Sequence, residues 1–443
     1  MQYIPTGADD RARMLRAIGV ESFEDLIANV PKALRLARLD LPAGISELEL
    51  DREFDEIGSA NKNFKYHTPY IGAGNYDHFI PAAVDRLAMR GEFLTAYTPY
   101  QGEASQGTLQ ALYEYQSLIS ELTAMDFSNG SMYDGASSLA EAALLAVRST
   151  GRRKVILPEA VHPEYAAVVR TYLSHLGTEV ITAPLVDGGT DAAALERLVG
   201  ADTAAVIFQQ PNFFGFLEDA KALADAAHAA GALAIACVNP ISLGIVAPPG
   251  EYGADIAVGE GQPLGNPVSF GGPHFGFFTV KAELLRKIPG RIAGVSVDAD
   301  GERAFVLTLQ AREQHIRREK ATSNICTNQA LCALRGAVYL ALLGRPGIRK
   351  VALLNLQNAA ETCKRLLAIR GVERFSARPF FNEFTLRIRK DKARLEASLK
   401  KHGILGPLCL ERFGPYPDAW LVAVTEKRTA ADLERLARAV EEA

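Results

Sequence analysis

The chain has 443 residues, which is enough for one large core and one or two smaller units. Hydrophobic residues make up 48% and charged residues 23% of it, a balance that excludes a disordered protein. The net charge of −4 indicates no basic surface of the kind that nucleic acids or anionic membranes attract. We therefore expect a globular protein that binds neither nucleic acid nor membrane.

The cysteines and the N-terminus indicate a cytoplasmic protein without a metal. Five cysteines are scattered along the chain, without a CxxC pair or a histidine at metal-ligand spacing: Cys237, Cys326, Cys332, Cys363 and Cys409. We expect them to be reduced and mostly buried. The N-terminus has no basic start leading into an apolar run, so no secretory signal is expected. No uninterrupted stretch of about 18 apolar residues predicts a membrane span.

The N-terminal part of the chain has the pattern of helices and connecting segments. An apolar stripe at helical spacing ends before Gly19, which is well placed to stop a helix. Ser22 and Asp25 then form a capping-box pattern that opens a short second helix. We expect residues 1–70 to form a small helical arm packed on the main body.

From Lys154 onward, short apolar strands alternate with helices. The expected strands are Lys154–Leu157, Glu179–Thr182, Ala204–Gln209, Leu233–Val238, Ile256–Val258 and Gly272–Val280, and the expected helices are Tyr165–Leu176, Ala193–Val199 and Ala220–Ala230. Such alternation predicts crossover connections and a mostly parallel sheet, with ligands bound at the carboxyl ends of its strands. We assign residues 71–345 to this large α/β domain.

The pattern changes again after Gly344. The expected helices are Ile348–Ile369, Lys392–His402 and Thr429–Glu441, and the expected strands are Glu383–Ile388 and Trp420–Val424. About a hundred residues is an ordinary size for a domain. Residues 346–443 are therefore expected to form a small C-terminal α+β domain.

Polar residues and glycines gather in loops at strand ends and helix starts. In residues 96–107, hydroxyl and amide groups crowd a proline-fixed turn, and they either line a binding cleft or pack at the surface. The candidates in this loop are Tyr97, Thr98, Tyr100, Gln101 and Gln106. Further along, Ser138 and Glu141 form a capping-box pattern after Gly135, and the free N–H groups of such a helix start bind phosphate readily.

Three further strand ends carry polar side chains. His162 either stacks on a planar cofactor or caps the helix that follows it. Residues 209–215 place amides before an aromatic run, and Asn239 closes the next strand. Spacing and chemistry thus predict a cleft at the carboxyl edge of the sheet, and they leave the ligand open.

The run of residues 309–327 resembles the signature of glycine decarboxylase, the P-protein of the glycine cleavage system. Residues 97–107, 133–141, 266–275 and 294–298 also match that family, so the resemblance covers nearly the whole chain. The family includes long single-chain enzymes with two similar halves and bacterial enzymes split into two subunits. At its length this chain resembles subunit 1, the N-terminal half.

The resemblance implies a fold-type I, aspartate aminotransferase-like scaffold that works with pyridoxal phosphate (PLP). It also implies an activity: glycine is decarboxylated, and its aminomethyl group passes to the lipoyl arm of H-protein, with PLP as the electron sink. The implied partners are a homologous PLP-bearing subunit 2 and lipoylated H-protein. A dimer of heterodimers is the natural symmetric assembly.

Two residues that such a cofactor site requires are missing from this chain. The lysine is expected after the strand that ends at Val258, but residues 259–265 contain none, and Lys281 follows a further strand. The aspartate that keeps the pyridine nitrogen protonated is expected near the end of Leu233–Val238, where Asn239 stands. We therefore expect a degenerate cofactor site and PLP bound by the partner subunit. The candidates for the degenerate site are Ser138, His162 and Asn239.

Positive charge is concentrated between residues 312 and 320. A charge run is usually a solvated helix face, but the family resemblance favours the subunit junction or the entrance of the active site. The candidates are His274, Arg312, His315, Arg317, Arg318, Lys320 and Asn324. For His274 a turn-stabilising role is the simpler alternative.

Three functions remain open at this point. The preferred one is a PLP-free subunit that the glycine decarboxylase complex requires for activity. The others are a stand-alone fold-type I PLP enzyme that uses an unexpected lysine, and a scaffold subunit that only stabilises its partner. Aromatic density at residues 213–216, Phe270 and 275–278 further predicts an apolar face that the partner covers.

Overall fold

The computed structural model describes residues 5–36, 40–325 and 327–443. The chain divides into two compact units, Met1–Lys62 and Asn63–Ala443. This boundary falls before residue 70 because β1 (Thr68–Pro69) pairs in parallel with β15 (Ile404–Leu405), and Tyr70 is buried in the core of the second unit. Cys326 and the first four residues, on which two of the expectations rest, lie outside the described residues.

The first unit consists of short helices: α1 (Ala8–Ile18), α2 (Phe23–Leu26) and α3 (Glu47–Ser59). Gly19 ends α1 in the left-handed conformation with φ of 86°, and Ser22 caps α2 together with Asp25, as the sequence predicts. Among the described residues of these helices no side chain is buried. That the unit packs on the main body stays a prediction.

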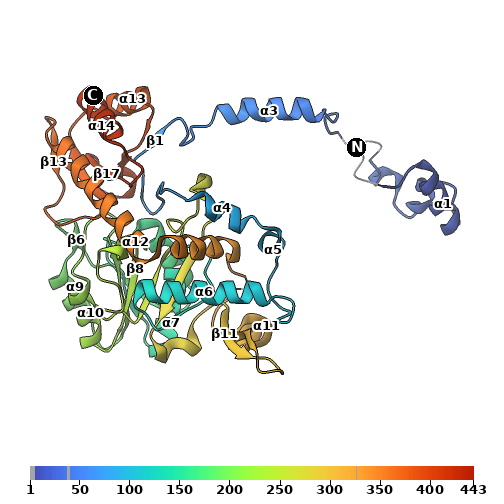
Figure 1. Ribbon diagram of the computed structural model, residues 1–443, viewed down its shortest axis with the longest axis horizontal. Coiled ribbons are helices and arrows are strands. Elements are labelled where there is room, and N and C mark those ends of the chain that lie inside the picture. Colours follow the sequence, from blue (N-terminus) through green and yellow to red (C-terminus); the bar gives the residue numbers. More distant parts are fainter. Residues whose placement is uncertain (1–4, 37–39, 326) are drawn as a thin grey trace. The chain divides into compact units, whose positions relative to one another are not determined.

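The second unit is built on a seven-stranded sheet with the order β2-β10-β9-β8-β7-β3-β4. Its strand β8 is labelled in Figure 1. The strands are β2 (Phe127–Ser128), β3 (Lys154–Ile156), β4 (Glu179–Ile181), β7 (Thr203–Gln210), β8 (Leu233–Val238), β9 (Ile256–Glu260) and β10 (Gly276–Val280). All neighbours run in parallel except β10, which is antiparallel to both β2 and β9. The predicted mostly parallel sheet is therefore confirmed.

Helices cover both faces of this sheet. Alternate residues of β7 point to opposite faces, so Val206 and Phe208 join one core while Ala205 and Ile207 join the other. The first core is covered by α6 (Gln106–Thr123), α10 (Ala220–Ala229) and α12 (Ala330–Leu367), and the second by α7 (Gly135–Thr150) and α8 (Pro163–Leu173). The smaller α4 (Ala82–Ala88), α5 (Gly91–Leu94) and α9 (Ala192–Leu198) flank these layers.

Two hairpins extend from this sheet: β5 (Leu185–Val186) with β6 (Gly189–Thr190), and β11 (Ile292–Val297) with β12 (Arg303–Thr308). The C-terminal layer is an antiparallel sheet of β13 (Val372–Arg374), β14 (Glu383–Ile388), β17 (Ala419–Ala423) and β16 (Leu408–Cys409), in that order. It packs with α13 (Lys392–Lys401) and α14 (Ala430–Glu441) around a third core.

Helix α12 connects the two layers and is longer than predicted. Gly344 has non-helical backbone angles inside it, two residues before Pro346, so the predicted domain boundary corresponds to a kink between two helical stretches. By length and composition alone α12 is the one described helix that could cross a membrane. Its buried side chains belong to the first and third cores, which is typical of a core helix.

The aromatic residues that were expected to face a partner are buried inside the chain itself. Phe213, Phe214 and Phe216 form a small cluster with Leu410 and Leu421 where the two layers meet. The phenylalanines of residues 275–278 are fully buried as well. Only Phe270 is open, with 82% of its surface exposed. The prediction of an apolar face at these aromatics is therefore wrong, because the small C-terminal layer covers the first group and the large sheet absorbs the second.

Candidate functional site

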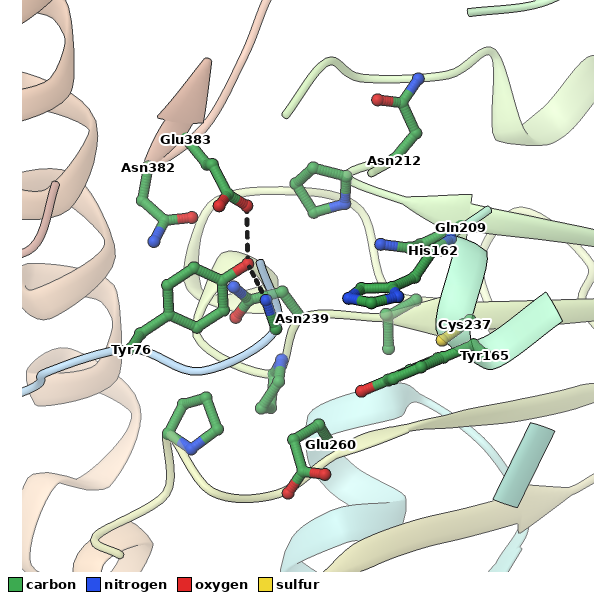
Figure 2. Close-up of a pocket in the computed structure, with 15 residues that line it drawn as sticks. Tyr76, His162, Tyr165, Gln209, Asn212, Cys237, Asn239, Glu260, Asn382 and Glu383 are labelled. Carbon is green, nitrogen blue, oxygen red and sulfur yellow. Dashed lines mark hydrogen bonds between the residues drawn. The ribbon is translucent and has the colours of Figure 1, made fainter. Parts of the chain in front are cut away.

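A pocket of about 480 Å³ lies at the carboxyl ends of β7, β8 and β9 (Figure 2). Parallel α/β sheets bind their ligands at this edge, and the sequence predicts the cleft there. The sheet side of the wall includes Gln209, Cys237, Asn239 and Glu260. Facing them are Gly74 and Tyr76 from the segment after β1, and Asn382 and Glu383 from the start of β14.

Helix α7 begins next to this pocket, one turn earlier than predicted. Asp134 is its N-cap, and the Asp134 carboxylate accepts a hydrogen bond of 2.7 Å from the backbone N–H of Ser137. Ser138 is buried in the first turn, where its hydroxyl donates to the carbonyl of Asp134 at 2.6 Å. The predicted capping box of Ser138 and Glu141 is therefore wrong, because Asp134 and Ser137 form the capping box at the start of α7.

The carboxyl group of Glu260 occupies the start of α7, where a phosphate would bind. Its Oε2 accepts a hydrogen bond of 3.1 Å from the N–H of Gly135, and its Oε1 accepts one of 3.0 Å from the N–H of Gln262. A Cβ atom added at Gly135 would lie 2.7 Å from the Tyr165 hydroxyl and 2.9 Å from the backbone nitrogen of Glu260. The helix start that binds anions in related folds is thus filled by the chain itself.

His162 caps the helix that follows it, which is one of the two predicted roles. Its Nδ1 accepts from the N–H of Glu164 at 3.1 Å, and its Nε2 donates to the carbonyl of Ala73 at 3.1 Å. The ring stacks on Tyr165 with centroids 4.7 Å apart and meets the edge of Phe213. Burial lowers the pKa of His162, so the ring is neutral and enclosed.

The end of β8 carries no acid. The side chain of Asn239 hydrogen-bonds the hydroxyl of Tyr76, and its Oδ1 accepts from the N–H of Ile241 at 3.0 Å (Figure 2). Burial raises the pKa of the Cys237 thiol to about 12, which keeps it neutral. An amide and a neutral thiol cannot hold a pyridine nitrogen in its protonated form.

Among the described residues that line the pocket there is no lysine or arginine. Lys281, the next lysine after β9, forms an ion pair of 2.7 Å with Asp255 and does not line the pocket. PLP needs a lysine, an acid at its pyridine nitrogen and a free anion site, and this pocket offers none of the three. The residues here do not fit PLP.

Three pocket residues have roles that no sequence motif indicates. The Tyr76 hydroxyl donates to Glu383 Oε2 at 2.7 Å, and the N–H of Ala73 donates to Glu383 Oε1 at 2.7 Å. Burial raises the pKa of Glu383 to about 7 and that of Glu260 to about 8. Tyr76 and Glu383 meet only in the fold, since 307 positions separate them. The one local feature that could have indicated this role is Glu383 itself, an acid that opens the otherwise largely apolar strand β14.

The loop of residues 97–106 lies apart from this pocket, at the start of α6. It borders a second, largely apolar pocket of about 660 Å³ that includes Tyr97, Leu112 and Leu331 in its lining. Tyr97 is 78% and Tyr100 is 62% exposed, and the guanidinium of Arg291 lies 5.7 Å from the Tyr100 ring centre. Gln101 is exposed and Thr98 half-buried. The predicted cleft residues are therefore at the surface, and their role toward a substrate stays a prediction.

Gln106 fastens this loop to the neighbouring hairpin. Its Nε2 donates to the carbonyls of Gly102 at 2.7 Å and Phe305 at 2.9 Å, and its Oε1 accepts from the N–H of Phe305 at 2.8 Å. Gln106 thus has a positioning role, with its amide directed into the chain.

The basic run divides into a buried and an exposed part. The guanidinium of Arg312 is buried and donates to the carbonyls of Ile288 and, at 2.6 Å, Gly290. These bonds hold the segment to the body of the chain, and a role of Arg312 at a junction or entrance stays a prediction. The other predicted residues of the run are exposed: His315, Arg317, Arg318, Lys320 and Asn324. Their role at a junction stays a prediction.

His274 stabilises the glycine-rich turn that contains it. Its Nε2 donates to the carbonyl of Val268 at 3.2 Å, and its Nδ1 lies 3.9 Å from Glu260 Oε1. The residue is half-buried in this position, which matches the turn-stabilising alternative.

Comparison with known proteins gives the same family as the sequence motifs. The family model described as glycine cleavage system P-protein matches residues 1–440. Proteins named probable glycine dehydrogenase (decarboxylating) subunit 1 are 50% identical in Moorella thermoacetica and 48% identical in Desulfitobacterium hafniense, with at least 98% of each chain covered. The chain thus spans nearly the full length of these relatives.

Solved structures agree with this result. A crystal structure of glycine decarboxylase (P-protein) of the glycine cleavage system, in inhibitor-bound form, is 47% identical, with a TM-score of 0.91 and full coverage of both chains. A cysteine desulfurase of Escherichia coli, 16% identical with a TM-score of 0.63 over 90% of this chain and 98% of its own, shares the fold. The fold is the fold-type I scaffold of PLP enzymes, as predicted. This chain belongs to the glycine cleavage system P-protein family.

Proposed function

We propose that this chain is the PLP-free subunit 1 of a heteromeric glycine dehydrogenase (aminomethyl-transferring). The observation that carries the proposal is that the pocket does not fit PLP, since Glu260 occupies the start of α7 and no lysine is among the described lining residues. Relatives that share about half of its residues over the full length are named subunit 1 of the decarboxylating enzyme. A numbered subunit implies a second one, and the missing chemistry of this chain implies that the second one binds PLP.

The complete enzyme would decarboxylate glycine and pass the aminomethyl group to the lipoyl arm of H-protein. We propose a dimer of heterodimers in the cytoplasm, because symmetric closure is the usual form of such assemblies. PLP, bound by the partner subunit, would supply the electron sink. This chain would form the wall of the active-site cleft that faces the partner subunit, and would there bind, orient and enclose the substrate.

The loop of residues 97–106 is our candidate for that contribution. Tyr97 and Tyr100 present their rings and hydroxyls at the surface, and Gln106 fixes the loop from beneath. Side chains that are exposed yet held by a rigid base are suited to forming a wall of a site on another subunit. Such a wall would orient glycine or the lipoyl arm and exclude water as carbon dioxide leaves.

Mixing experiments test the proposal. Glycine–carbon dioxide exchange is measured with lipoylated H-protein and PLP for this chain, for the PLP-bearing subunit and for both together. We expect exchange only with both. Exchange by this chain alone would favour a stand-alone PLP enzyme. Equal rates for the freshly folded partner with and without this chain would favour a purely structural scaffold, and either result would refute the proposal.

A further inference from the structure

The pocket that excludes PLP keeps two carboxyl groups of its own, the buried Glu383 and the half-buried Glu260. Among the described residues neither pairs with a lysine or an arginine, and the side chain of His274 approaches Glu260 with its Nδ1 at 3.9 Å from Oε1. An acid buried without a counter-charge takes up a proton or requires a cationic partner. Burial without a positively charged partner raises the pKa of Glu383 to about 7 and that of Glu260 to about 8.

A third polar group in the same wall also lacks a partner. The Asn382 side chain is 1% exposed, and its amide nitrogen has no hydrogen-bond partner within the described part of the chain. A buried amide N–H without an acceptor costs about 1–3 kcal/mol. Native proteins therefore rarely leave such a group unpaired, and an ordered water or a bound molecule supplies the missing acceptor.

The polar groups stand on two sides of one small cavity. In Figure 2, Tyr76, Asn382 and Glu383 lie on one side, and Gln209, His162 and Tyr165 lie on the other. Gln209 uses its amide oxygen to accept from the N–H of His162 at 2.8 Å, so its amide nitrogen is the end available to a ligand. The cavity thus combines acids that can accept from a cation with amides that can donate.

Other ligand classes fit this wall less well. Phosphates and large anions need basic side chains, and none of the described lining residues is a lysine or an arginine. Divalent metals need several clustered ligands, and the described residues contain no group of three or more His, Cys, Asp or Glu side chains placed to hold one. The pocket, whose volume of about 480 Å³ includes its open mouth, is lined in part by Pro211, Pro240 and Pro263 and has room only for a small molecule.

We propose that the former cofactor pocket is a binding site for a small primary ammonium compound of amino-acid size. Its ammonium group would donate to the Glu383 carboxylate, with Glu260 adding negative potential from the sheet side. A carboxylate on the ligand, where present, would accept from the amide nitrogen of Gln209. The site lies within this chain's own pocket, and the inference goes beyond the proposed function.

Hydrogen–deuterium exchange of the assembled complex, read by mass spectrometry on peptides of this chain, tests the site. The probes are glycine and methylammonium chloride, and the controls are sodium acetate and tetramethylammonium chloride at equal ionic strength. At about twice Kd a ligand slows exchange that requires opening of its site about threefold, because only the closed form binds it. We expect this protection in residues 72–78 and 381–385 with glycine or methylammonium and not with the controls. Reading only this chain's peptides separates the site from glycine binding at the partner.

Matched variants then identify the acceptor. Glu383→Gln should abolish the protection, while Glu141→Gln should keep it, because Glu141 is an equally buried acid with a raised pKa that does not line the pocket. Absence of protection in the wild-type complex would overturn the proposal, whatever the variants do. So would equal protection by tetramethylammonium or acetate, or undiminished protection in folded Glu383→Gln.

Discussion

A substitution at Gln106 tests how the loop 97–106 is held in place, without changing the exposed side chains that we propose contact the substrate. The substitution Gln106→Met keeps the length and volume of the side chain and removes its three hydrogen bonds to Gly102 and Phe305. At about 0.5–1.5 kcal/mol for each bond, the loop loses about 2–4 kcal/mol of local stability. Amide exchange in residues 97–105 should therefore become at least about tenfold faster.

The same substitution tests whether the position of the loop matters for the reaction. Because each 1.4 kcal/mol corresponds to about a tenfold change in rate, we expect glycine–carbon dioxide exchange to fall at least about tenfold, with subunit assembly and PLP content intact. Gln110→Met is the matched control, since Gln110 lies one turn along the same helix and bonds only Glu114 at the surface. Faster amide exchange with an unchanged reaction rate would show that the loop is packing alone. Unchanged amide exchange would refute the assignment of Gln106 as the residue that holds the loop to the hairpin.

Two further predictions concern exposed side chains of the loop 97–106 and the buried acid Glu141. Tyr97→Phe, Tyr100→Phe and Gln101→Ala should each lower the glycine–carbon dioxide exchange rate about ten- to a hundredfold without dissociating the subunits, and full activity in all three would contradict this. Burial raises the pKa of Glu141 to about 7, so the folded chain binds that proton more tightly than the unfolded one, and stability is lost as pH rises from about 4.5 to about 8. Glu141→Gln should remove about 3 kcal/mol of this decline in urea titrations at several pH values, and an unchanged slope would show that Glu141 is ionised throughout.

The sequence predicts the scaffold well because strand and helix periodicity are local properties. Strand Leu233–Val238 has the predicted bounds, and the alternation of strands and helices gives the parallel order of the sheet. The start of α7 was placed too late because two overlapping capping patterns, Asp134 with Ser137 and Ser138 with Glu141, compete in the sequence. Only the tertiary contact between Gly135 and Glu260 distinguishes them.

The sequence predicts the position of the cleft and shows which cofactor-binding residues are missing, but it does not predict which residues line the pocket instead. The absence of a lysine between Val258 and Gly265 can be read from the sequence. The residues that close the pocket cannot, because Tyr76 and Glu383 come from opposite ends of the chain and carry no motif. The burial of Arg312 could not be predicted for a related reason: its carbonyl partners at Ile288 and Gly290 are brought to it only by the fold.

Reductive trapping of the cofactor tests the central claim most directly. The assembled complex is treated with borohydride in the presence of PLP, both subunits are digested, and phosphopyridoxyl-lysine is mapped by mass spectrometry. The account predicts one stoichiometric label on a lysine of the partner subunit and none on this chain, with or without its partner. A stoichiometric phosphopyridoxyl-lysine on this chain, at Lys281 or at any other lysine, would contradict it.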